Sequence, residues 1–142
     1  EILKLARGRA RQEMAETKAP ERLLTQAQIF EARAAVLDMY MAPPLEQYII
    51  QLVLATREPG RYGDDLPRWI SWGASPRGTI ALDRCARAHA WLNARDYVTP
   101  ADIHAIAIDV LRHRVLLSYE AEAEGIRPEN VVAALLERVP LP

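Results

Sequence analysis

Prolines divide this chain into helical segments, and they constrain its fold more than any other feature. Pro43-Pro44, Pro100 and Pro128 each stand at the start of a run in which apolar residues recur at helical spacing. Proline is tolerated in the first turn of a helix, where its missing N–H is not needed, but it disrupts a helix interior. The chain is therefore expected to fold as separate helices joined by short turns.

The apolar periodicity predicts where these helices lie. Thr25 with Gln28 resembles a capping box, and Ser75 and Thr99 are predicted N-caps. The predicted helices cover residues 2–16, 25–41, 43–56, 75–93, a segment that begins at 99, and 128–139. The fold class is predicted as all-α, a bundle of five or six helices with one short extended segment near 115–119.

The remaining segments are predicted as irregular. Residues 57–72 are expected to form a loop, since they are rich in Gly, Pro and Asp, and residues 120–125 form an acidic connector. The helix at 25–41 carries Phe30, Ala34, Leu37 and Met41 at helical spacing. The helix that starts at Ser75 is expected to bury Leu82, Cys85, Ala86, His89 and Leu92.

Length and charge exclude several classes of protein. A chain of 142 residues can form one compact domain, and its net charge of −1 gives no general attraction to nucleic acid or to an anionic membrane. Cys85 is the only cysteine, so no internal disulfide can form, and a cytoplasmic location is expected. No apolar run is long enough to span a membrane. The chain lacks an initiator Met, and we expect it to be part of a longer protein.

Several kinds of catalytic site are absent from the sequence. No glycine-rich loop ends in Gly-Lys-Ser or Gly-Lys-Thr, so the chain has no P-loop of its own. His89, His104 and His113 lack the spacing of a zinc site, and no Gly-x-Ser-x-Gly motif occurs. His89 is interpreted as a core histidine and Asp64-Asp65 as a solvated turn. No metal site is predicted.

The turn Gly73-Ala74-Ser75-Pro76-Arg77 places an arginine in the first turn of a predicted helix. A helix N-terminus carries roughly half a positive charge, so it attracts anions and disfavours a nearby cation. An anion bound between them would satisfy both. Arg77 is therefore predicted to form one half of a phosphate contact whose other half lies outside this chain.

The same turn begins a series of motifs that resembles the C-terminal helical lid of MoxR-type AAA+ ATPases. The motifs are GASPRGT at 73–79, ARA at 86–88, DYVTPADI at 96–103, DVLRHR at 109–114 and SYEA at 118–121. The resemblance is strong over residues 57–142 and more general over 25–56. Because these motifs occur in order, the resemblance is far more specific than the turn alone.

The resemblance implies that Arg77 is the sensor-two arginine, which reaches the terminal phosphate of ATP held by the AAA+ core. The implied nucleotide-site residues are Gly73, Ala74, Ser75, Pro76 and Arg77. Mg²⁺ would accompany ATP in the complete protein. Arg57 and Arg114 match positions that often carry arginine, and their roles are left open between interdomain or intersubunit salt bridges and nucleotide contact. Trp69 and Trp72 depart from the smaller aliphatic residues expected there.

The resemblance also implies partners for the chain. Residues 1–24 would be a helical connector from an AAA+ core, and residues 25–142 would form the lid. The complete protein is expected to hydrolyse ATP as a ring-shaped homo-oligomer with a chaperone-like function, and a protein with a von Willebrand factor A domain is an expected partner. The fragment alone is expected to be catalytically silent and to bind no nucleotide stably.

Two other functions stay open from the residues alone. A stand-alone helical module could bind a protein, or a nucleic acid through the arginines of residues 7–11 or through Arg84 and Arg87, although the interspersed acids give no basic stripe. A scaffold without a ligand would leave Arg77 unexplained.

Overall fold

The computed structural model describes Lys4 and residues 23–142. The chain divides into two compact units, Glu1–Glu31 and Ala32–Pro142. Apart from Lys4, the helix predicted at residues 2–16 lies outside the described residues. The division into a connector at 1–24 and a lid at 25–142 stays a prediction.

Helix α2 (Gln26–Asp38) begins at the predicted capping box. The Thr25 N–H donates to Gln28 Oε1 at 2.8 Å, and the Gln28 N–H donates to Thr25 Oγ1 at 3.2 Å. No residue of α2 is buried. Met41, which was predicted on this helix, lies beyond its end and is buried in the second unit. The helix is therefore confirmed, but its end comes earlier than the sequence predicts.

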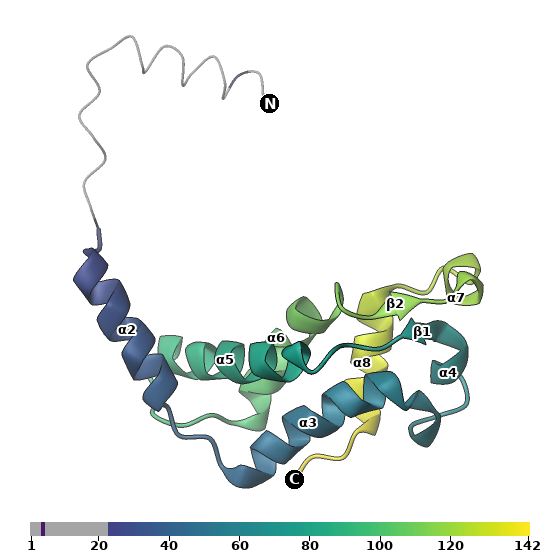
Figure 1. Cartoon of the computed structure of the whole chain (residues 1–142), viewed down its shortest axis with the longest axis horizontal. Coiled ribbons are helices and arrows are strands. Elements are labelled where there is room, and N and C mark those ends of the chain that lie inside the picture. Colours follow the sequence, from purple (N-terminus) through teal and green to yellow (C-terminus); the bar gives the residue numbers. More distant parts are fainter. Residues whose placement is uncertain (1–3, 5–22) are drawn as a thin grey trace. The chain divides into compact units, whose positions relative to one another are not determined.

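Four helices of the second unit enclose its apolar core (Figure 1). Proline is the first residue of three of them, as the sequence predicts. The bounds are α3 Pro43–Arg57, α5 Arg77–Leu92, α6 Pro100–Leu111 and α8 Pro128–Arg138. Burying one large aliphatic side chain contributes about 1.5–3 kcal/mol. The largest fully buried aliphatic residues are Ile49, Leu52, Leu66, Leu82, Ile103, Leu111, Val131, Val132 and Leu135.

Helices α5 and α6 lie side by side in opposite directions (Figure 1). A Cβ placed on Gly78, near the start of α5, would lie 3.6 Å from Leu111 Cδ2 at the end of α6. Near the other end of the pair, His89 Nδ1 lies 2.7 Å from Asp102 Oδ1. The start of α5 is thus next to the end of α6.

The buried face of α5 differs from the predicted stripe. Leu82 and Ala86 are fully buried as predicted, but Cys85 and Leu92 are exposed and His89 is only half-buried. The buried residues of α5 are Gly78, Leu82, Ala86 and Ala90. The prediction favoured the larger apolar residues, whereas three of these four positions carry Gly or Ala, which allow α6 to approach closely.

The segment 57–72 is more ordered than the predicted loop. It contains the 3₁₀ turn η1 (Pro59–Arg61), the short helix α4 (Leu66–Trp69) and the strand β1 (Ile70–Trp72). Elements this short carry no readable periodicity, because helices are recognised over longer windows. Leu66 is fully buried and anchors this segment to the core.

Strand β1 pairs antiparallel with β2 (Leu116–Leu117), which confirms the extended segment predicted at 115–119. The predicted acidic connector at 120–125 is wrong over its first four residues, which belong to α7 (Tyr119–Ala123). Ser118 starts this helix, because its Oγ accepts a hydrogen bond of 3.1 Å from the Ala121 N–H. The result is an all-α bundle with a two-stranded ribbon and two short helices at one end (Figure 1).

Candidate functional site

Arg77 is the first residue of α5, and its side chain is exposed. Among the described residues, no hydrogen-bond acceptor or carboxylate pairs with its guanidinium. The positive end of the α5 dipole lies at this position, so a cation here is disfavoured unless an anion joins it. The structure therefore places an exposed cation where an anion would be favoured.

Ser75 does not cap α5 with its hydroxyl, contrary to the prediction. Pro76 has helical backbone angles, with φ −55° and ψ −21°, and occupies the N-cap position without any side-chain cap. The Gly78 N–H donates to the Ser75 carbonyl at 2.7 Å, and the Thr79 N–H donates to the Pro76 carbonyl at 3.1 Å. Because these two N–H groups are engaged within the turn, the exposed Arg77 guanidinium is the positively charged side chain available at this helix end to meet an anion.

The turn before Arg77 is held against the last turn of α3. Ala74 is fully buried, and its N–H donates to Thr56 Oγ1 at 2.8 Å. Gly73 lies so close to α3 that a Cβ there would be 2.3 Å from the Thr56 carbonyl oxygen. Glycine is required where two backbones approach this closely. Gly73 and Ala74 thus support Arg77, and their direct contact with a nucleotide stays a prediction.

Arg57 and Arg114 lie at the C-termini of helices, where cations are favoured. Arg57 is the last residue of α3, and its Nη1 donates to the Ala74 carbonyl at 3.5 Å. Arg114 follows α6, and its Nη1 donates to the Val110 carbonyl. These two arginines have structural partners that Arg77 lacks within the described chain. Their contacts with other domains or subunits stay predictions.

Known proteins are similar to this chain in sequence and in fold. Residues 68–135 match the family model of the AAA lid domain. The chain is 35% identical over 123 residues to Chaperone MoxR1 of Mycobacterium tuberculosis, a match that covers 86% of this chain and 33% of the relative. This chain is a lid of the MoxR-type AAA+ family.

Two further relatives agree with this assignment. The chain is 41% identical over 107 residues to Protein MoxR of Methylorubrum extorquens, a match that covers 70% of this chain and 31% of that protein. The crystal structure of a proposed ATPase from Cytophaga hutchinsonii matches with a TM-score of 0.83 and 41% identity, over 86% of this chain and 37% of that one. The MoxR-type lid therefore spans about a third of the length of the curated relatives, and the predicted lid-type bundle is confirmed.

The two tryptophans that are predicted to depart from the family pattern have different environments in this MoxR-type lid. Trp69 is partly buried against the core, and its Nε1 donates to Glu124 Oε2 at 3.3 Å. Trp72 is 71% exposed and is the partner of Leu116 across the ribbon. Neither tryptophan displaces the Gly73 turn, since that turn keeps its hydrogen bond to α3.

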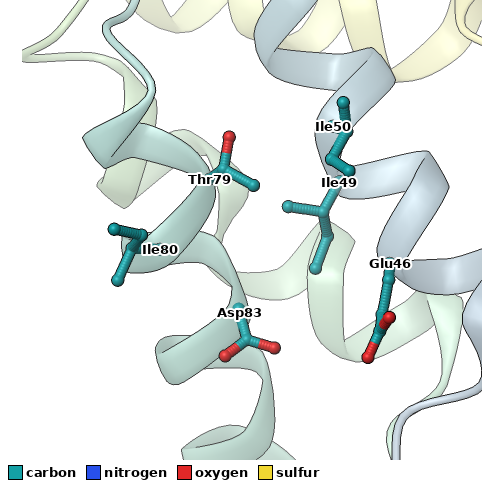
Figure 2. A pocket seen from close by; sticks show the side chains of 6 residues that line it. All are labelled: Glu46, Ile49, Ile50, Thr79, Ile80 and Asp83. Carbon is teal, nitrogen blue, oxygen red and sulfur yellow. The ribbon is translucent and has the colours of Figure 1, made fainter.

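A shallow cavity of about 220 Å³ lies between α3 and α5, beyond Arg77 along the helix (Figure 2). Ile49, Ile50 and Ile80 supply its apolar walls, and two carboxylates also line it. The lining residues are Glu46, Ile49, Ile50, Thr79, Ile80 and Asp83. Apolar walls with carboxylates do not suit a phosphate. The anion-favouring end of the MoxR-type lid is therefore the start of α5 and not this cavity.

Sequence reasoning missed a buried polar cluster at the other end of the α5–α6 pair. Asp102 is fully buried and accepts hydrogen bonds from His89, Arg95 and Thr99. Burial opposes ionisation, but these donors outweigh it and hold the pKa of the Asp102 carboxyl well below its ordinary value. The capping-box spacing from Thr99 to Asp102 was the available signal. His89 is therefore a partner of this carboxylate and not a core histidine.

Other kinds of site find little support among the described residues of this lid. No group of three His, Cys, Asp or Glu side chains within them could hold a metal ion. Asp65 is engaged by Arg138, whose hydrogen bond lowers the Asp65 pKa to about 2. None of the helices in the described part of the chain is long and apolar enough to cross a membrane.

Proposed function

We propose that, in the complete ATPase, Arg77 of this lid contacts the terminal phosphate of ATP held by the AAA+ core. The observation that carries the proposal is the position of Arg77, which is exposed and has no partner among the described residues at the N-terminus of α5. A guanidinium can donate in parallel to two phosphate oxygens, and the α5 dipole favours the same negative charge.

Only the phosphate groups of the nucleotide fit this end of the lid. Arg77 would bind the terminal phosphate and stabilise the charge that develops when the phosphoryl group is transferred to water. The described residues offer no cluster of carboxylates for Mg²⁺. We therefore propose that the ligands of Mg²⁺ and the glycine-rich loop belong to the AAA+ core, so this chain supplies one residue to a shared site.

We further propose that the complete protein is a chaperone-like ring of identical subunits in the cytoplasm, with a von Willebrand factor A domain protein as a partner. The name of one relative, Chaperone MoxR1, supports the chaperone-like role. Arg57 and Arg114 are candidates for interdomain or intersubunit salt bridges, because both lie at the same end of the bundle as Arg77. The hydrogen bonds they make within the lid leave donors on each guanidinium.

The test is ATP turnover by the complete protein with Arg77→Ala. We expect kcat/KM to fall by about tenfold or more, because a charge-assisted hydrogen bond contributes about 1.5–3 kcal/mol. Arg84→Ala is the matched control, since Arg84 is an exposed arginine of the same helix. Turnover of Arg77→Ala equal to that of the wild type would refute the proposal.

A second test uses the 142-residue chain alone. We expect no measurable ATP turnover and at most weak nucleotide binding by calorimetry, because one guanidinium without a phosphate-binding loop gives little affinity. Robust hydrolysis by the pure chain that disappears in Arg77→Ala would show instead that the lid contains a complete site.

A further inference from the structure

Thr56 is a fully buried polar residue in the last turn of α3, eighteen positions before Ala74. Its hydroxyl donates to the Val53 carbonyl at 2.7 Å and accepts the Ala74 N–H at 2.8 Å. Because a backbone N–H can only donate, the hydroxyl proton must point to Val53, and the lone pair is left for Ala74. The Thr56 side chain therefore satisfies a buried N–H that lies three residues before Arg77.

The backbone around this hydrogen bond leaves the turn no room to move toward α3. A Cβ on Gly73 would meet the Thr56 carbonyl oxygen at 2.3 Å and the Arg57 nitrogen at 2.8 Å. On the other side of the turn, a Cβ on Gly78 would contact Val53 Cγ2 of α3 at 3.6 Å. The turn therefore packs against α3 both before and after Arg77. Thr56 supplies the hydrogen bond that joins the turn to α3.

We propose that Thr56 is a positioning residue for Arg77, acting through the Ala74 N–H. This inference rests on the proposed function of Arg77 at the terminal phosphate. Arginine contacts with phosphate depend on the direction of the guanidinium, and a displacement of about 1 Å can reduce turnover strongly. Through the same hydrogen bond, a movement of α3 is carried directly to the turn that holds Arg77.

The test is a set of substitutions at Thr56 in the complete ATPase. Thr56→Val keeps the shape of the side chain but loses the acceptor, so the Ala74 N–H is left without a partner. Thr56→Ser keeps the hydroxyl and loses only a methyl group. We expect kcat/KM to fall about tenfold in Thr56→Val and to return to within about threefold of the wild type in Thr56→Ser.

A double substitution separates positioning from a purely structural role. If Thr56 acts through Arg77, Thr56→Val combined with Arg77→Ala has the same turnover as Arg77→Ala alone. Multiplication of the two losses in the double variant would overturn the inference, as would wild-type kinetics of Thr56→Val. Wild-type kinetics of Arg77→Ala would instead refute the proposed function, so the two failures are distinguishable.

Hydrogen exchange of the complete protein, followed by mass spectrometry, keeps the inference testable if Thr56→Val is unstable. We expect faster exchange in peptides covering residues 73–77 in both Thr56→Val and Thr56→Ala, with peptides covering 103–110 unchanged. Equal acceleration in both regions would indicate general unfolding and would overturn the specific role of Thr56. Unchanged exchange at 73–77 would also overturn it.

Discussion

Asp102 Oδ1 lies 2.7 Å from His89 Nδ1, so the start of α6 is joined to the last turns of α5 by a buried carboxylate. Arg95 donates to both oxygens of the same carboxylate, and the Thr99 N–H donates to Oδ2 at 2.8 Å. The same two helices are also in contact at the other end of the pair. There, the end of α6 packs against the start of α5, which carries Arg77.

We expect Asp102→Asn to reduce the free energy of unfolding of this chain by about 3 kcal/mol. Removing one partner of a buried ion pair leaves the other charge without compensation. Urea unfolding followed by circular dichroism measures the change. Asp65→Asn is the matched control, because Asp65 also pairs with an arginine but is about one-third exposed, and its effect should be clearly smaller. Equal losses in the two variants would contradict the role of burial.

The same carboxylate predicts how stability depends on pH. The pKa of Asp102 is lower in the folded chain than in the unfolded chain, so folding favours its ionised form. Its contribution is fully present above the unfolded pKa of about 3.9 and is lost progressively as the pH falls toward the lower folded pKa. Unfolding midpoints measured from pH 6 downward should fall more steeply for the wild type than for Asp102→Asn. Parallel curves would contradict this prediction.

Gly73→Ala is expected to destabilise the chain by about 1–3 kcal/mol, because the added Cβ would overlap the Thr56 carbonyl and force the backbones apart. Gly60→Ala is the control, since a Cβ there would have only an ordinary contact of 3.7 Å with Pro67. Thermal unfolding should separate the two variants. If Gly73→Ala is as stable as Gly60→Ala, the turn can move away from α3 without a loss of stability.

Arg77→Glu is expected to raise the stability of this chain and to lower the activity of the complete protein. A carboxylate at the N-terminus of α5 interacts favourably with the helix dipole, so the free energy of unfolding should rise by about 0.3–1 kcal/mol relative to Arg77→Gln. The same variant should impair ATP turnover by the complete protein, because it places like charges together. A variant that is both less stable and fully active would contradict the assignment of Arg77.

Cys85 is expected to react with a thiol reagent in the folded chain. The sequence places it on a predicted buried stripe, but the structure shows it exposed on α5. Absorbance after addition of a chromogenic disulfide should report one thiol per chain without denaturant. Protection of the thiol until urea is added would show that Cys85 belongs to the buried face of α5 and would contradict this prediction.

Local signals in the sequence were sufficient for the long helices. Pro43, Pro100 and Pro128 start α3, α6 and α8 as predicted, because proline's missing N–H and fixed φ act within a single helical turn. The capping boxes at Thr25 and Thr99 are local for the same reason. The position of Arg77 at the start of α5 was also predicted from the residues around it.

Other features depended on partners distant in the chain. Strand β1 exists because β2, more than forty residues later, pairs with it, and α4 is anchored by burial of Leu66. The choice between Cys85 and Ala90 for the buried face of α5 was decided by the close approach of α6. Periodicity alone cannot make this choice, because it does not contain the position of the neighbouring helix.

By itself, the sequence predicted where α3, α5, α6 and α8 lie, which lid motifs the chain carries, and that one arginine stands at the start of α5. The tertiary structure alone decided what holds that arginine in place. The Thr56 hydroxyl accepts a hydrogen bond from the Ala74 N–H, eighteen positions later in the chain, and Gly73 lies against the Thr56 carbonyl. Such contacts form only when α3 and the turn are packed together, because neither residue carries a local signal of the other.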